Sequence, residues 1–91
     1  MRIADQIRTK ITRDLNPERL DITDDSHKHK GHAGHRPGGE SHFTLTVVSR
    51  VFEGQSRLAR QRQVYRILAE ELAGPVHALA LNLKTPEEAS E

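Results

Sequence analysis

The order in which two hydrophobic spacings follow each other along the chain restricts the fold most. Apolar residues first recur at every fourth position, at Ile3, Ile7, Ile11 and Leu15. With polar residues between them, this spacing predicts an amphipathic helix that buries one face. The helix is expected to end at residues 16–17, Asn-Pro, because the residue before a proline is disfavoured in the α region.

Three later segments show the two-residue alternation that is typical of half-buried strands. They are residues 19–25 (RLDITDD), 42–49 (HFTLTVVS) and 76–83 (VHALALNL). In the second segment Phe43, Leu45 and Val47 share one face, and in the third His77 shares a face with the leucines. The alternation therefore predicts a small sheet with one face turned toward a core.

A second helix is predicted over residues 57–72, where Ser56 is a suitable N-cap and residues 74–75, Gly-Pro, end the helix. Its inner face is expected to contain the large apolar residues Leu58, Val64, Tyr65, Ile67, Leu68 and Leu72. Pro86 is expected to open a short or frayed final helix.

The order helix, strand, strand, helix, strand and short helix predicts an α/β (α+β) fold in which helices cover one face of a three-stranded sheet. With 91 residues, the chain is expected to form a single domain over residues 1–91. This domain includes a long His/Gly-rich loop at 26–41 and an acidic C-terminal tail at 86–91. A connection as long as this loop is usually functional or disordered.

The composition excludes several classes of function. Cysteine is absent, so the chain forms no disulfide, and any metal cluster that it binds must take sulfur from another molecule. No apolar run approaches the roughly 20 residues of a membrane span, and the charged N-terminal segment is unlike a secretory signal. The chain also lacks a nucleophile elbow, a phosphate loop and an HExxH helix. We therefore expect a cytoplasmic binding protein that is not an enzyme.

Histidines gather in residues 26–43, SHKHKGHAGHRPGGESHF, which contain His27, His29, His32, His35 and His42. Imidazole can replace thiolate on one iron of a [2Fe–2S] cluster, so such a loop is suited to completing a coordination sphere. The spacing lets several imidazoles approach one centre without selecting among them. The alternative is a solvated loop that binds metal only adventitiously. His42, at the start of a strand, is expected to have a structural or hydrogen-bonding role.

Arginines gather after the middle strand, and Glu53 is the only acid between residues 50 and 66. The second helix carries four arginines, at Arg57, Arg60, Arg62 and Arg66. Arg62 and Arg66 are one turn apart and share a side of the helix. The strip is suited to nucleic-acid phosphates, to an acidic partner protein or to glutathione, or it is a solvated face in which Arg66 pairs with Glu70. The three aromatic residues are expected in the core, so the chain has no stacking platform for single-stranded nucleic acid. The predicted nucleic-acid ligand of the strip is therefore duplex DNA.

Four segments together resemble the BolA family over nearly the whole chain. They are residues 40–43 (ESHF), 48–54 (VSRVFEG), 60–72 (RQRQVYRILAEEL) and 76–88 (VHALALNLKTPEE). The resemblance implies a fold similar to that of class II KH domains and an association with monothiol glutaredoxins. In such pairs a [2Fe–2S] cluster is shared, with the glutaredoxin cysteine and a glutathione thiol on one side and the BolA-like chain on the other.

The same resemblance implies which histidines are cluster ligands. It matches His77 to the ligand of the last strand and His32, in GHAGH, to the ligand of the loop, with His35 and His29 as alternatives. The strand pattern alone favours a different role for His77, that of a half-buried histidine bonded to a neighbouring carbonyl.

The implied function is the binding or transfer of a [2Fe–2S] cluster in iron–sulfur and iron homeostasis. The alternative, from bacterial members, is a DNA-binding transcriptional regulator of stress response and cell morphology. Two departures from related patterns matter here. Residues 60–62 read Arg-Gln-Arg where BolA-like chains often carry Arg-His-Arg, and residues 54–57 contain one glycine where the nucleotide clamp of KH domains has GxxG. The second departure weakens a nucleic-acid function by analogy with KH domains.

Overall fold

The computed structural model describes residues 2–25 and 41–90 of the chain. The helices and strands in these ranges are α1 (Ile3–Leu15), β1 (Arg19–Asp24), β2 (His42–Val48), the 3-10 helix η2 (Arg50–Phe52), α2 (Arg57–Ile67), α3 (Ala69–Ala73), β3 (Ala78–Lys84) and α4 (Pro86–Ala89). Apart from Ser41, the predicted loop at 26–41 lies outside the described residues.

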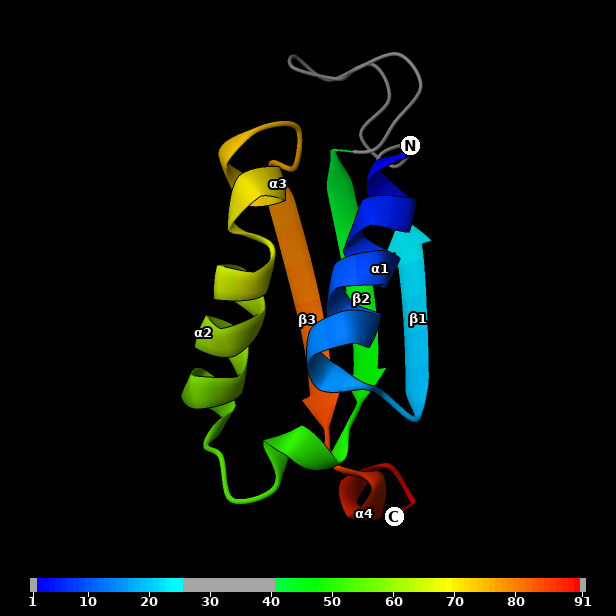
Figure 1. The fold of residues 1–91 in the computed structure, drawn as a ribbon, viewed down its shortest axis with the longest axis vertical. Coiled ribbons are helices and arrows are strands. Elements are labelled where there is room, and N and C mark those ends of the chain that lie inside the picture. Colours follow the sequence, from blue (N-terminus) through cyan, green and yellow to red (C-terminus); the bar gives the residue numbers. More distant parts are fainter. Residues whose placement is uncertain (1, 26–40, 91) are drawn as a thin grey trace.

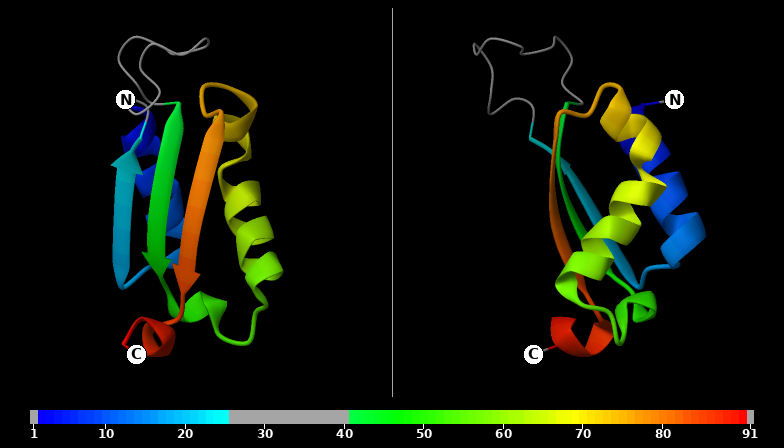
Figure 2. Two further views of the ribbon diagram at one scale, coloured as in Figure 1. Left: turned by 180° about the vertical axis from the view of Figure 1, so that it is seen from behind. Right: turned by 90° about the vertical axis from the view of Figure 1, so that its left-hand side faces the viewer.

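The three strands form one mixed sheet in the order β1-β2-β3. β1 pairs with β2 in antiparallel orientation, and β2 pairs with β3 in parallel orientation. A parallel pair needs a crossover connection, which α2 and α3 supply. Both α1 and α2 lie on the same face of the sheet (Figures 1 and 2). The predicted α+β fold, with helices on one face of a three-stranded sheet, is therefore confirmed.

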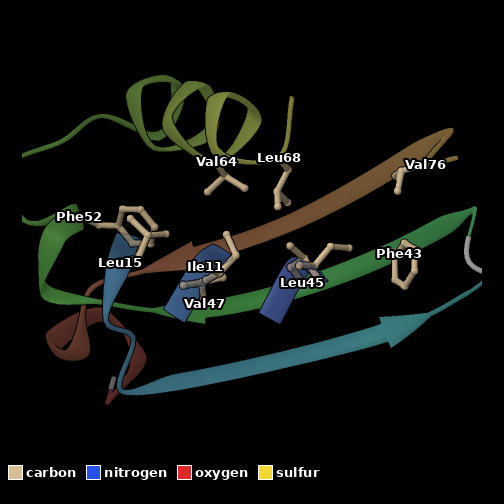
Figure 3. Packing of buried hydrophobic residues seen from close by; sticks show 10 residues of the cluster. Ile11, Leu15, Phe43, Leu45, Val47, Phe52, Val64, Leu68 and Val76 are labelled. Atoms are coloured by element: carbon tan, nitrogen blue, oxygen red, sulfur yellow. The ribbon is translucent and has the colours of Figure 1, made fainter. Parts of the chain in front are cut away.

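The core fills the space between the sheet and these helices (Figure 3). It contains Ile7, Ile11, Leu15, Phe43, Leu45, Val47, Phe52, Val64, Leu68 and Val76. In β2 the predicted alternation is confirmed, because Phe43, Leu45 and Val47 are buried and the residues between them are only half-buried. The fourfold stripe of α1 is also confirmed, since three of its four members are buried and Ile3 packs against the core.

The end of α1 follows the prediction from the Asn-Pro pair. Asn16 adopts a left-handed conformation with φ 42°, which stops the helix. The buried hydroxyl of Ser49 donates to the carbonyl of Leu15 at 2.6 Å. This bond satisfies one of the carbonyls that a helix end leaves without a partner within the helix.

The second predicted helix differs from the structure in two respects. The predicted helix over residues 57–72 is divided into α2 and α3 at Leu68, where φ is −102° and ψ is 21°. The predicted inner face is also partly wrong, because Leu58 is 56% and Tyr65 is 43% exposed. The buried stripe is instead formed by Arg60, Val64 and Leu68, which are four residues apart. Arg60 lies on the inner side of α2, where it has hydrogen-bond partners inside the protein.

The sequence predicted a short or frayed final helix, and the structure has the short helix α4, which is capped rather than frayed. Thr85 accepts a hydrogen bond from the N–H of Glu88 at 3.1 Å, and the Glu88 carboxylate accepts one from the N–H of Thr85 at 2.8 Å. This reciprocal pair is a capping box, and Pro86 opens the helix behind it. α4 is thus held at the end of β3.

Within residues 2–25 and 41–90, none of the helices has the length and apolar character needed to cross a membrane.

Candidate functional site

His77 lies at the end of the sheet where β2 and β3 begin (Figure 1), and we call this end the His77 edge. The residue directly precedes β3 instead of lying within the strand predicted over 76–83. Its N–H donates to the carbonyl of Ser41 at 2.7 Å, and the N–H of Ala78 donates to the same oxygen at 3.2 Å. Val76 is buried, and its N–H donates to the carbonyl of Glu71 at 3.0 Å. The backbone on both sides of His77 is therefore held, while the residue itself is exposed.

His42 is the second histidine of the His77 edge. Its ring centroid lies 6.3 Å from that of His77, with an angle of 31° between the two ring planes. The hydroxyl of Ser41 lies 2.9 Å from Nδ1 of His42. A hydrogen bond to one ring nitrogen fixes the orientation of a histidine ring and leaves the other nitrogen for a ligand. The sequence predicted a structural or hydrogen-bonding role for His42, which agrees with its contact with Ser41. It did not predict the proximity to His77, because that depends on the parallel pairing of β2 with β3.

Asp25 and Ser41, the residues on either side of segment 26–40, both lie at the His77 edge. The N–H of Asp25 donates to the carbonyl of His42 at 2.7 Å, and the hydroxyl of Thr44 donates to the Asp25 carboxylate. On the other side, Ser41 is buried and bonded to the N–H of His77. The predicted loop ligands His32, His35 and His29 lie outside the described residues.

The His77 edge does not form a complete metal centre by itself. In the part of the chain that the structure describes, no group of three or more histidine, cysteine or acidic side chains is arranged to hold a metal ion. His77 and His42 can offer at most two nitrogens. Any metal centre at this edge must take its other ligands from residues 26–40 or from another molecule.

The structure removes Arg60 from the predicted basic surface strip. Its side chain is only 9% exposed, and its Nη1 lies 2.7 Å from a carboxylate oxygen of Glu88. Further hydrogen bonds run to the carbonyls of Gln55 and Leu83, both at 3.1 Å, and the guanidinium lies 5.7 Å from the ring centroid of Phe52. The hydrogen bond from Arg60 lowers the pKa of Glu88 to about 2, with help from the N–H of Thr85. Arg60 is therefore an internal connection between α2, β3 and α4.

The other three predicted arginines stay on the surface. Among the described residues, Arg57, Arg62 and Arg66 make no ion pair and no side-chain hydrogen bond. The alternative pair between Arg66 and Glu70 is not formed, since Glu70 instead lies 3.5 Å from Nζ of Lys10. Arg62 and Arg66 line a shallow hollow on α2. Arg57 lines a different hollow, between the start of α2 and the end of β3.

The helix-covered mixed sheet, with histidines at one end and arginines along one helix, defines a small α+β domain. The family model described as "BolA-like protein" matches residues 11–88. The chain therefore belongs to the BolA-like family, and the resemblance found in the sequence is confirmed.

Curated relatives and a solved structure agree with this assignment. "BolA-like protein 1" of Bos taurus is 52% identical over 85 residues, which is 93% of this chain and 60% of that protein. "DNA-binding transcriptional regulator BolA" of Haemophilus influenzae is 40% identical over 88 residues, which is 97% of this chain and 82% of that protein. The structure of BolA1 from Arabidopsis thaliana is 42% identical, with a TM-score of 0.87, and the match covers 97% of this chain and 96% of that one. The chain thus spans only 60% of the length of its mammalian relative.

Proposed function

We propose that this BolA-like protein associates with a monothiol glutaredoxin and glutathione to bind or transfer a [2Fe–2S] cluster in iron–sulfur and iron homeostasis. The observation that carries the proposal is the exposed imidazole of His77 on a held backbone. A second imidazole lies 6.3 Å away, and both ends of the histidine-rich segment start from the same edge.

The donor set of the chain fits this cluster. With no cysteine, the chain offers nitrogen and leaves sulfur ligands to the glutaredoxin and glutathione. His77 would supply one nitrogen, and His32 would supply a second, with His35 and His29 as alternatives. His32 follows Asp25 by seven residues, which can span at most about 25 Å, so the chain is long enough to return to the His77 edge.

Histidine ligation suits a cluster that has to be released as well as held. When bound, the cluster can take up or release an electron, and nitrogen ligands raise its reduction potential compared with thiolates. Imidazole binds a metal through an unprotonated ring nitrogen, so histidine ligation is sensitive to protonation. The chain acts in this proposal by association and contributes ligands rather than a catalytic group.

Anaerobic assembly with a defined partner tests the proposal. The chain is mixed with a purified monothiol glutaredoxin, glutathione, ferrous iron and sulfide, and the complex of the two proteins is isolated by size-exclusion chromatography. We expect visible absorption and iron in that complex, and we expect His77→Ala to remove both. Thr46→Ala, a half-buried residue on the same strand as His42, is the folded control. A colourless and iron-free complex of the wild-type chain, or an unchanged spectrum with His77→Ala, would contradict the proposal.

A DNA-binding regulator is the second candidate function. It is favoured by the surface arginines Arg57, Arg62 and Arg66 and by the printed name of the Haemophilus influenzae relative. If these three arginines contact phosphates, the slope of log affinity against log salt concentration should be about −3. Titration of a duplex at several salt concentrations measures that slope. No binding at low salt, or a slope that does not change in Arg62→Gln, would exclude this function.

A further inference from the structure

We propose that the outer face of α2 is a docking surface for a protein segment that carries acidic residues beside an apolar anchor. This surface, which we call the outer α2 face, consists of Leu58, Arg62, Tyr65 and Arg66. It extends from the start of α2, at the end of the molecule opposite the His77 edge (Figure 1). The inference concerns a separate surface and does not depend on the proposed cluster function.

The apolar part of the outer α2 face is unusually exposed. Within residues 2–25 and 41–90 only three large hydrophobic residues are exposed, and Leu58 at 56% and Tyr65 at 43% are two of them. They are seven residues apart, so they stand two helical turns from each other on one side of α2. Isolated exposed apolar residues are common, but two on the same stripe of one helix form an unpartnered apolar strip. Tyrosine is also among the residues that dominate binding energy at protein interfaces.

The charged part of the same face is positive and has no internal complement. Arg62 lies on the helix between Leu58 and Tyr65, and Arg66 follows one turn later. No acidic residue occurs in α2, and the first two acids that follow it, Glu70 and Glu71, are engaged by Lys10 at 3.5 and 2.8 Å. Guanidinium groups bind carboxylates through two parallel hydrogen bonds. A complementary partner would therefore present carboxylates about one helical turn apart.

A shallow hollow runs along this face, and its lining includes all four residues of the outer α2 face together with Gln63. The hollow thus offers apolar contact and two cations within one strip of helix.

The apolar residues favour a protein occupant over a nucleic acid. Duplex DNA would bind arginines through phosphates, and these contacts leave a leucine side chain in water. A protein segment with an apolar side chain between two carboxylates would instead cover Leu58 and Tyr65 and pair with Arg62 and Arg66. A protein interface usually has a desolvated apolar centre that is surrounded by a polar rim.

An unbiased peptide selection tests the inference. A random 12-residue peptide library displayed on phage is selected on the immobilised chain, with counter-selection on the double variant Leu58→Ser/Tyr65→Ser. We expect the retained peptides to carry Asp or Glu on both sides of a large apolar residue. Binding of one retained peptide, measured by fluorescence anisotropy, should weaken at least tenfold in Arg62→Glu/Arg66→Glu and in Leu58→Ser/Tyr65→Ser.

Two control variants separate this surface from other effects. Arg8→Glu makes the same change of charge per residue on an exposed position of α1 and should leave peptide affinity within twofold, as should His77→Ala. All the changed α2 residues are exposed, so each variant is expected to fold. Circular dichroism checks this. Retained peptides without acidic residues, equal binding by all variants, or tight duplex DNA binding in place of peptide binding would each overturn the inference. Peptide binding that survives His77→Ala also keeps it distinct from the cluster function.

Discussion

Arg60 and Glu88 form a two-point ion pair, with Nη1 2.7 Å from Oε1 and Nη2 3.3 Å from Oε2. The two residues are 28 positions apart, and the pair links the middle of the domain to its last helix. The same guanidinium donates to the carbonyl of Leu83 at 3.1 Å, so one side chain joins α2, β3 and α4. An arginine in this position organises the fold and is not available to a ligand.

Replacing Arg60 should therefore destabilise the domain. We expect Arg60→Ala to lower the free energy of unfolding by about 2 to 3 kcal/mol, because buried hydrogen-bond acceptors lose their donor. For a domain of this size the loss corresponds to a fall in Tm of roughly 10 °C or more. Thermal unfolding followed by circular dichroism measures it. Arg62→Ala, two residues away on the exposed side, is the matched control and should change Tm little; an equal loss in both variants would contradict the assignment.

The low pKa of Glu88 predicts an acid-dependent part of the stability. A carboxylate whose pKa is lowered from 4.5 to about 2 stabilises the folded state above pH 4.5, and this contribution is lost as the pH falls toward 2. Compared with wild type, Glu88→Gln should thus be less stable at pH 7, and the difference should disappear near pH 2. Urea unfolding at a series of pH values measures it. Glu87→Gln is the neighbouring control, and a difference for Glu88→Gln that is constant from pH 7 to pH 2 would exclude the ion pair as its cause.

The orientation of α2 in the structure predicts different outcomes for the same Leu→Ala substitution at two positions. Leu68 is 1% exposed and belongs to the core, whereas Leu58 is 56% exposed. Leu68→Ala should cost about 2 to 5 kcal/mol through lost burial and a cavity, and Leu58→Ala should cost within about 0.5 kcal/mol. Chemical denaturation of both variants checks this. A loss at Leu58 as large as that at Leu68 would instead support the inner face predicted from the sequence, which contained both leucines.

The contact between Lys10 and Glu71 predicts an alkaline limit. Nζ of Lys10 lies 2.8 Å from a carboxylate oxygen of the buried Glu71, and this hydrogen bond raises the pKa of Lys10 above its usual value of 10.5. The stabilisation is therefore complete below pH 10.5 and is lost as the pH rises through the higher folded-state pKa. Lys10→Met should be less stable than wild type at pH 7, with a difference that shrinks above pH 10.5.

A double-mutant cycle separates the ion pair from other effects of that substitution. Lys10→Met leaves the carboxylate of Glu71 buried without its partner, so Lys10→Met/Glu71→Gln should recover part of the lost stability. Free energies of unfolding for the four proteins give the coupling. Strictly additive losses would show that the two side chains do not interact.

Sequence reasoning located the elements well where the pattern depends on neighbouring residues. The stripe of α1, its end at Asn16, the N-cap at Ser56 and the alternation of β2 all follow from local backbone preferences and side-chain spacing. The inner face of α2 was predicted less well, because periodicity treats leucine and tyrosine as core residues and arginine as a surface residue. Arg60 reverses this rule only because Glu88 and the carbonyl of Leu83 satisfy its charge and its donors.

The candidate site shows the same division. His77 was singled out from the sequence through the family resemblance, and the family itself is confirmed by the match over residues 11–88. His42 was not assigned to the site, since nothing in the local pattern relates it to a residue 35 positions later. The roles of His32, His35 and His29 as ligands stay predictions, because these residues lie outside the described ranges.

The sequence by itself determined which segments are helices and strands, the α+β class and the family, because hydrophobic spacing, caps and helix-ending residues act over a few positions. Only the tertiary structure decided that the ring of His42 lies near that of His77, that Arg60 is internal, and that Leu58 and Tyr65 remain in contact with solvent. These three outcomes depend on contacts between residues far apart in the chain. Strand register and the pairing of buried charges set such contacts, and neither is encoded in local spacing.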